Sequence, residues 1–235
     1  MTEPPARCHA LVPCAGIGAR AGVALPKQYA DVAGRAMVAH TLDALARVAR
    51  IEATLVVLAP DDDLFERRVP GFAGRVARVG GATRARSVAN GVAELLAHGA
   101  HADDWVLVHD AARCLVRPEW IEQLIDACAR DAVGGLLALP LADTLKEERL
   151  EGDVARVAAT LQRRGKWAAQ TPQMFRLGLL ARALAAAGDD ATDESSAVEA
   201  LGLAPRLVRG SVGNLKVTWP EDFAIAERLL GRPTR

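Results

Sequence analysis

The sequence lacks the cysteine patterns that zinc-binding and redox domains use. Its four cysteines contain no C-x-x-C pair; they are Cys8, Cys14, Cys114 and Cys128. This spacing argues against a zinc ribbon or a thioredoxin-type site. Four cysteines in 235 residues are also too few for the disulfide framework that holds many small secreted domains together.

The sequence also lacks an excess of charge of either sign. Lys and Arg number 29, Asp and Glu number 29, and the formal net charge is zero. A dedicated nucleic-acid or membrane-surface binder would normally carry a basic excess. No apolar segment is long enough to span a bilayer, and the first residues lack the basic stretch and apolar run of a secretory signal. We therefore expect a cytoplasmic protein with no nucleic-acid partner and no membrane partner.

Short apolar runs alternate with helical patterns along the chain. The runs predict buried strands at 8–12, 53–58, 76–79, 105–109 and 133–139. Apolar residues at three- and four-residue spacing predict helices at 38–48, 84–96 and 119–129. Thr218 and Glu221 have capping-box spacing before a last helix that ends near Leu230. This alternation predicts one α/β domain over 1–235, with a mostly parallel twisted sheet and helices on both faces.

The segment 143–167 departs from this pattern. It is polar, charged and weakly periodic, and it reads DTLKEERLEGDVARVAATLQRRGKW. Long irregular insertions in compact domains are often functional. Either a long surface loop or a projecting β-arm would fit this composition.

A glycine-containing segment follows the first predicted strand. It reads PCAGIGAR, and Arg20 at its end and Lys27 beyond it add two cations. Glycines allow close backbone approach, and successive free N–H groups can bind phosphate oxygens. The Walker A pattern does not fit, because no hydroxyl residue follows Lys27. The dinucleotide-binding pattern does not fit either, because the glycines read G-x-G-x-x-x-G and Asp61 comes too late to be its acidic residue. A structural turn with two solvated cations stays open as the alternative.

Asp110 comes directly after the predicted strand 105–109. Ligands of open α/β sheets bind at the carboxyl ends of strands, and one carboxylate there suits Mg²⁺, which takes its other ligands from phosphates and water. An Asp that caps the next segment or pairs with Arg113 would leave the same pattern. From these residues alone both interpretations stay open.

Further basic residues lie in three other segments, of which the first is a candidate for anion binding. The segment GGATRARS, which contains Arg84, follows a strand and opens a helix. Lys216 lies in a short extended run near the end of the chain, and Arg163 lies in the irregular segment. Taken alone, Lys216 and Arg163 are typical solvated surface residues.

Several other motifs do not support a function. His98 and His101 resemble a metal cluster, but the intervening Gly99 indicates a helix end and a turn. The Ser195–Ser196 pair lacks the G-x-S-x-G context of a hydrolase. Thr192 is expected to cap a helix whose first turn holds Asp193 and Glu194.

Seven segments, taken together and in order, resemble the 2-C-methyl-D-erythritol 4-phosphate cytidylyltransferase family of the non-mevalonate isoprenoid pathway. They extend from Pro13 to Glu227, nearly the whole chain. They read PCAGIGARAGVALPKQY, GGATRARSV, VLVHDAAR, ADTLKE, QTPQMF, TDESSAVE and NLKVTWPEDFAIAE. Cys14, Cys114 and Trp219 depart from the usual pattern, and these departures affect packing more than chemistry.

The resemblance implies a Rossmann-like nucleotidyltransferase fold and a homodimer whose arm, at about 143–167, projects to the partner. It implies a CTP site lined by Ala15, Gly16, Gly18, Gly81, Arg84 and Ser87, with Gly81 and Ser87 facing cytosine. Arg20 and Lys27 would stabilise the transition state, and Asp110 would bind Mg²⁺ or another divalent cation. The polyol phosphate would be held by Thr144, Arg163 and Lys216, the first two from the partner subunit.

The resemblance predicts transfer of a cytidylyl group from CTP to methylerythritol phosphate with release of pyrophosphate. An ionised phosphate oxygen is the nucleophile, so the reaction needs no general base, and catalysis reduces to positioning and electrostatic stabilisation. Two alternatives stay open at this point: a ribitol 5-phosphate cytidylyltransferase, and a non-catalytic nucleotide-binding module.

Overall fold

A seven-stranded sheet forms the centre of the protein. The computed structural model describes residues 6–16 and 25–231. The strands lie in the order β11-β7-β10-β6-β1-β4-β5, and all are parallel except β10, which is antiparallel to β6 and β7. Their bounds are β1 Cys8–Pro13, β4 Ile51–Val57, β5 Arg75–Ala77, β6 Trp105–Val108, β7 Gly134–Pro140, β10 Trp167–Arg176 and β11 Arg206–Arg209.

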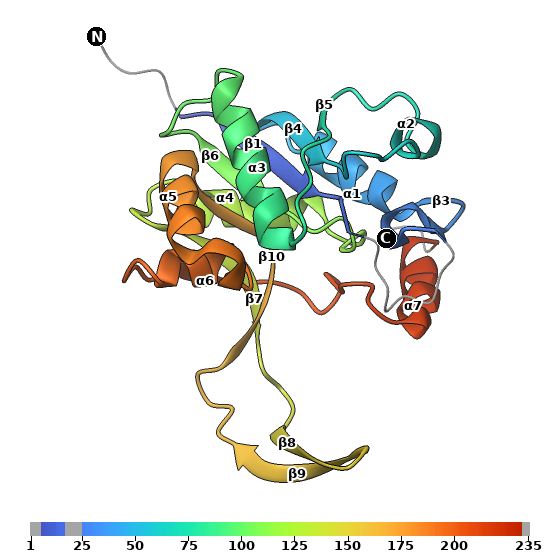
Figure 1. Cartoon of the computed structure of the whole chain (residues 1–235), viewed down its shortest axis with the longest axis vertical. Helices are drawn as coiled ribbons and strands as arrows, with labels where there is room; N and C mark the ends of the chain where they lie inside the picture. The colour runs from blue at the N-terminus through green and yellow to red at the C-terminus, as the bar shows by residue number, and fades with distance from the viewer. Residues whose placement is uncertain (1–5, 17–24, 232–235) are drawn as a thin grey trace.

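Helices cover both faces of the sheet because successive strand side chains point in opposite directions. In β4, Val56 packs with one group of helices, whereas Leu55 and Val57 pack with the other. The first group is α1 (Met37–Ala46) and α4 (Pro118–Cys128); the second is α3 (Arg84–Ala97), α5 (Leu177–Ala187) and α6 (Glu194–Glu199) (Figure 1). This arrangement confirms the predicted α/β fold. Among the described residues, no helix has both the length and the apolar character to cross a bilayer.

A smaller layer closes one end of the molecule. There α7 (Pro220–Leu230) packs over Val32, Met37 and Val217 in a third apolar cluster. Helix α7 begins one residue later than the predicted capping box, because the side chain of Asp222 accepts hydrogen bonds from the backbone of Thr218 and Trp219 at 2.8 and 2.9 Å. The remaining short elements are η2 Lys27–Tyr29, β2 Asp31–Val32, β3 Arg35–Ala36, α2 Phe65–Arg68 and η3 Gly188–Asp190.

Strand β10 is the central element that the sequence pattern did not predict. It contains Pro172 and a polar Gln-Thr run, features that argue against a central strand. The register with β7 shifts between Ala169 and Gln173, so the strand bulges at the proline and resumes pairing beyond it. The five predicted strands lie within two residues of β1, β4, β5, β6 and β7.

The segment 143–167 forms a projecting β-arm. Strands β8 (Leu145–Glu151) and β9 (Val154–Leu161) pair only with each other among the described residues, and they extend away from the sheet on the continuations of β7 and β10 (Figure 1). The turn between them uses Gly152 at φ 62°. Of the two alternatives for this segment, the β-arm is confirmed.

Asp104 fastens the start of β6 to the start of β1. Its buried carboxylate accepts hydrogen bonds from the backbone N–H groups of Arg7 and His101, from the guanidinium of Arg7 and from His9 Nε2. Burial alone would raise the pKa of Asp104, but these hydrogen bonds outweigh burial and lower the pKa below its usual range. The ionised form therefore stabilises the folded state.

We expect Asp104→Asn to lower the free energy of unfolding at pH 7 by about 2 kcal/mol or more, because the amide leaves buried donors unsatisfied. Because the folded-state pKa lies below the unfolded one, the stabilisation is complete above about pH 4 and is lost as the pH falls further. The gap between the wild type and Asp104→Asn should therefore close in acid. Urea denaturation at several pH values measures it, with the exposed neighbour Asp103→Asn as the control.

Candidate active site

A cavity of about 520 Å³ lies at the carboxyl ends of the parallel strands, where ligands of open α/β sheets bind. The loops after β1, β5 and β6, the turn η2 and the segment before α7 form its walls. Eight predicted site residues line it: Ala15, Gly16, Lys27, Gly81, Arg84, Ser87, Asp110 and Lys216. The other lining residues are Pro13, Cys14, Gln28, Ala82, Thr83, Ala111 and Ala112. Predicted residues Gly18 and Arg20 lie outside the described residues.

The loop after β5 presents the first turn of α3 to the cavity. Thr83 is the N-cap and its hydroxyl accepts a hydrogen bond from Arg86 N at 3.0 Å. Ser87 Oγ accepts from Gly81 N at 3.0 Å and donates to the Thr83 carbonyl at 2.9 Å, so this hydroxyl shapes the loop. A Cβ on Gly81 would lie 2.2 Å from Arg86 Cγ. Gly81 and Ser87 therefore define the loop conformation at a helix N-terminus, which favours anions.

Asp110 lies between two cations at the floor of the cavity. Its Oδ1 accepts from Arg84 Nε at 2.8 Å, and its Oδ2 lies 2.8 Å from Lys216 Nζ. Arg113 Nε lies 3.9 Å from the same Oδ2 and has no hydrogen-bond partner within the part of the chain that the structure describes. Burial alone would raise the pKa of Asp110, but the charges of Arg84 and Lys216 outweigh burial and lower it. Asp110 is therefore ionised at neutral pH.

Arg84 also binds a second carboxylate that sequence reasoning missed. Its two terminal nitrogens donate to Glu194 at 2.7 and 3.1 Å, and the Glu194 side chain is 1% exposed. The sequence suggested Thr192 as the N-cap of this helix, with Asp193 and Glu194 in its first turn. The N-cap is instead Asp193, which accepts from Ser196 N at 2.8 Å. Arg84 and Glu194 are 110 residues apart, and local sequence carries no signal for such a pair.

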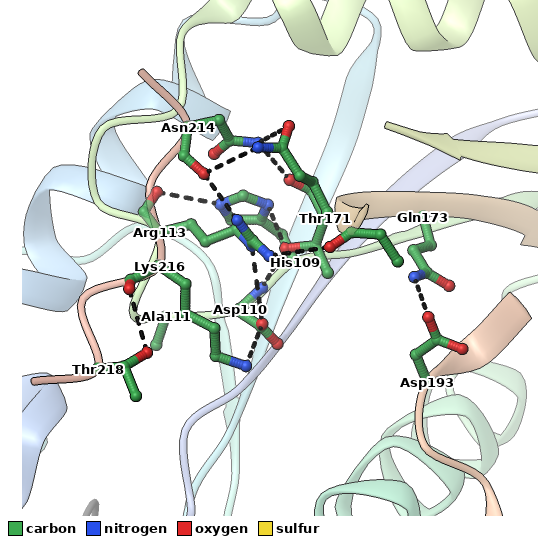
Figure 2. Close-up of polar contacts among 12 residues, drawn as sticks. His109, Asp110, Ala111, Arg113, Thr171, Gln173, Asp193, Asn214, Lys216 and Thr218 are labelled. Atoms are coloured by element: carbon green, nitrogen blue, oxygen red, sulfur yellow. Dashed lines mark hydrogen bonds and ion pairs between the residues drawn. The ribbon is translucent and has the colours of Figure 1, made fainter. Parts of the chain in front are cut away.

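A buried network fixes the backbone of Asp110 (Figure 2). Asp110 N donates to Thr171 Oγ1 at 3.0 Å, and Thr171 Oγ1 lies 3.1 Å from His109 Nδ1. His109 Nε2 lies 3.3 Å from the Arg113 carbonyl. Because that carbonyl can only accept, Nε2 carries the proton and Nδ1 accepts from the threonine hydroxyl. Burial lowers the pKa of His109 to about 4, so the imidazole is neutral.

The same network holds the segment that carries Lys216. Asn214 is fully buried. Its side chain donates to the Thr171 backbone carbonyl at 2.8 Å, and its backbone carbonyl accepts from Arg113 Nη1 at 2.7 Å. Two residues later, Lys216 points toward Asp110 (Figure 2). Lys27 Nζ reaches the same segment from the opposite wall and donates to the Val217 carbonyl at 2.7 Å. Residues far apart in sequence thus bring two lysines into one cavity.

Thr144 and Arg163 do not line this cavity. Thr144 is exposed just before β8, and Arg163 is exposed in the connection from β9 to β10. A separate hollow at the base of the arm includes Arg163, Arg164 and Lys166. Within this chain, the structure therefore brings together the loop residues of the predicted site and leaves the two arm residues apart.

The electrostatics of the cavity suit an anionic ligand. Lys27, Arg84 and Lys216 line it, and two carboxylates, Asp110 and Glu194, balance part of this charge. Burial raises the pKa of the Cys14 thiol, so that residue stays protonated rather than acting as a nucleophile. The arrangement favours binding and positioning of phosphate groups over covalent catalysis.

Comparison with known proteins gives a consistent assignment. The family model for IspD, 2-C-methyl-D-erythritol 4-phosphate cytidylyltransferase, matches residues 8–232. An enzyme of that name from Paraburkholderia xenovorans is 53% identical over 231 residues, covering 97% of this chain and 98% of the relative. The bifunctional enzyme IspD/IspF of Albidiferax ferrireducens is 62% identical over 225 residues, which are 95% of this chain but only 53% of that relative.

Solved structures agree with the sequence comparisons. A crystal structure of 4-diphosphocytidyl-2C-methyl-D-erythritol synthase superposes with a TM-score of 0.84 at 43% identity, covering 96% of this chain and 98% of the other. The 2-C-methyl-D-erythritol 4-phosphate cytidylyltransferase of Thermus thermophilus gives a TM-score of 0.75 at 32% identity, covering 94% and 97%. The chain therefore belongs to the 2-C-methyl-D-erythritol 4-phosphate cytidylyltransferase (IspD) family.

Proposed function

We propose that this chain transfers the cytidylyl group of CTP to 2-C-methyl-D-erythritol 4-phosphate, releases pyrophosphate and so serves isoprenoid biosynthesis. The observation that carries the proposal is the cavity lined by Lys27, Arg84, Lys216 and Asp110, beside the first turn of α3, in which Arg84 and Lys216 both contact Asp110. Both substrates are anions that such a cavity suits. The names of the relatives favour methylerythritol phosphate over the ribitol phosphate alternative. The proposal covers only the half of the bifunctional relative that this chain matches.

In this reaction the protein has to position the two substrates and stabilise the negative charge on their phosphates. An oxygen of the acceptor phosphate forms a bond to the α-phosphorus of CTP, and the bond from that phosphorus to the bridging oxygen of the β-phosphate breaks, so pyrophosphate leaves. The attacking oxygen is already ionised, so the side chains need not remove a proton. Lys27 and Arg20 would neutralise charge that builds up on the phosphates, and Lys216 would hold the acceptor phosphate.

Asp110 would hold a divalent cation, with Mg²⁺ the natural choice. Its carboxylate lines the cavity and is ionised, as a magnesium ligand must be. Among the described residues no group of three or more His, Cys, Asp or Glu could enclose a metal, so phosphates and water would complete the coordination shell. When bound, the cation would offset negative charge on the substrate phosphates.

The arm would complete the site in a homodimer. Large apolar side chains on the arm are exposed, including Leu150 at 69% and Val157 at 60%. A two-stranded hairpin that packs on nothing else is marginally stable, so a second copy of the chain is the natural cover for these residues. Two-fold symmetry would bring Thr144 and Arg163 of each chain to the cavity of the other.

The function is tested by measuring pyrophosphate release. CTP with methylerythritol phosphate should be turned over, whereas ATP or GTP should be poor donors because a site that hydrogen-bonds one base leaves its polar groups unpaired with another. Ribitol 5-phosphate should be a poor acceptor. Equal turnover of CTP and ATP would contradict the nucleotide assignment, and preference for ribitol 5-phosphate would contradict the acceptor.

Charge at the transition state is tested with Lys27→Ala. Loss of one preorganised cation should reduce kcat by about 100-fold or more, and Arg20→Ala should act similarly. The control is Arg67→Ala, which removes an exposed cation that pairs with Asp63 away from the cavity. Steady-state kinetics of pyrophosphate release measure the effect. Wild-type turnover in both Lys27→Ala and Arg20→Ala would remove these residues from the mechanism.

The shared site is tested by complementation. Lys27→Ala and Arg163→Ala chains, each inactive alone, are mixed so that subunits exchange. If Arg163 acts in the partner's site, each mixed dimer has one intact site, and random exchange should restore about a quarter of wild-type activity. If Arg163 serves its own chain, both sites of a mixed dimer carry a defect and activity stays at the level of the parents. Mass spectrometry of tagged chains verifies the exchange.

A further inference from the structure

Arg84 is held between two carboxylates that come from distant parts of the chain. Asp110 follows β6, Glu194 is the first residue of α6, and Arg84 itself is the first residue of α3. The guanidinium gives Nε to Asp110 Oδ1 at 2.8 Å and both terminal nitrogens to Glu194 at 2.7 and 3.1 Å. The two terminal nitrogens of the guanidinium thus both bind Glu194, and only the Nε–H group donates to Asp110.

The two oxygens of Asp110 consequently have different kinds of partner. Oδ1 is bound by Arg84, which Glu194 anchors from the other side. Oδ2 is bound by Lys216, whose flexible side chain is 40% exposed and lines the cavity. A lysine of this kind can move to a substrate phosphate and leave Oδ2 open, whereas an anchored guanidinium stays in place.

Glu194 is itself firmly placed. Asp193 and Ser196 form a capping box at the start of α6. Gln173 on β10 then fastens this turn to the sheet, since its side chain accepts from Ser195 N at 2.7 Å and donates to Asp193 at 2.9 Å (Figure 2 shows the second contact). The anchor for Arg84 is therefore part of the rigid core of the protein.

We infer that Glu194 is a positioning residue that keeps Asp110 accessible to a divalent cation. Without Glu194, the fork of Arg84 is free to turn onto both oxygens of Asp110, the bidentate arrangement that Arg and carboxylate favour. That arrangement would exclude the cation from Oδ2 even after Lys216 has moved. The inference rests on the proposed role of Asp110 as the metal ligand.

The test measures CTP binding by calorimetry with no acceptor present, once with Mn²⁺ and once with EDTA. Glu194→Gln removes the charge but keeps the shape of the side chain. It should weaken the Mn²⁺-dependent gain in CTP affinity by about tenfold or more, the scale of losing a residue that orients a metal ligand. Binding of CTP in EDTA should be no weaker, because removal of a carboxylate does not repel an anion. The matched control is Glu66→Gln, which removes a bidentate pair with Arg78 outside the cavity and should change neither affinity.

A second variant separates occlusion from a general structural role. In Arg84→Met/Glu194→Gln neither member of the pair is charged, and the guanidinium of Arg84 is no longer present to cover Asp110. This variant should regain most of the Mn²⁺-dependent gain that Glu194→Gln loses. Because Arg84 also lines the proposed CTP site, the comparison uses the Mn²⁺-dependent gain and not the absolute CTP affinity. If this gain is no larger in the double variant than in Glu194→Gln, the inference is overturned. Equal weakening of CTP binding with Mn²⁺ and with EDTA in Glu194→Gln would also overturn it, since that marks a folding defect.

Asp110→Asn distinguishes a failure of the inference from a failure of the function on which it rests. If Asp110→Asn loses the Mn²⁺-dependent gain while Glu194→Gln keeps it, only the role of Glu194 is wrong. If Asp110→Asn keeps the gain, the metal assignment to Asp110 is wrong, and the role of Glu194 falls with it.

Discussion

The site depends on one buried carboxylate that cannot be ionised without help. Asp110 lies just after β6, and burial by itself would raise its pKa and favour the protonated form. Cations from segments before and after it in the chain, Arg84 and Lys216, reverse that balance. The ion pairs of Asp110 with Arg84 and Lys216 therefore have two roles. They keep Asp110 charged in the absence of ligand, and they collect, at one place, the positive charge that two polyanionic substrates require.

This arrangement explains how a chain with zero net charge can handle triphosphates. What matters is the local positive charge at the cavity and not the net charge of the chain. The lysines that supply it contact protein groups, and such contacts can be exchanged for contacts with a ligand. Lys216 contacts Asp110, and Lys27 donates to the carbonyl of Val217. In the proposed reaction, substrate phosphates would replace these partners with stronger contacts. Because the nucleophile of the proposed reaction ionises on its own, the protein needs no activated serine or cysteine. Buried His109, neutral and with both ring nitrogens engaged, fits a scaffold role.

The sequence predicted those parts of the molecule whose causes are local. Buried parallel strands are continuous apolar runs, so β1, β4, β6 and β7 could be found, and side chains just after such strands, such as Asp110, could be placed at one edge of the sheet. Strand β10 was missed because Pro172 and its polar neighbours break the pattern, and the compensation for that break is a bulge against β7. Glu194 was missed for a different reason. Its partner lies 110 residues away, and in a single sequence a buried acid in a first helical turn is indistinguishable from a solvated one.

The arm and the site share a strand, which ties the proposed dimer to the proposed chemistry. Strand β10 returns from the arm, passes Thr171 and Gln173, and pairs with β6 next to Asp110. Thr171 positions the backbone of Asp110 and, through its own carbonyl, the Asn214 side chain that precedes Lys216. Gln173 fastens the turn that carries Glu194. The polar residues that make β10 a poor strand in sequence are the ones that connect the site, so the irregularity of this strand is the cost of its function.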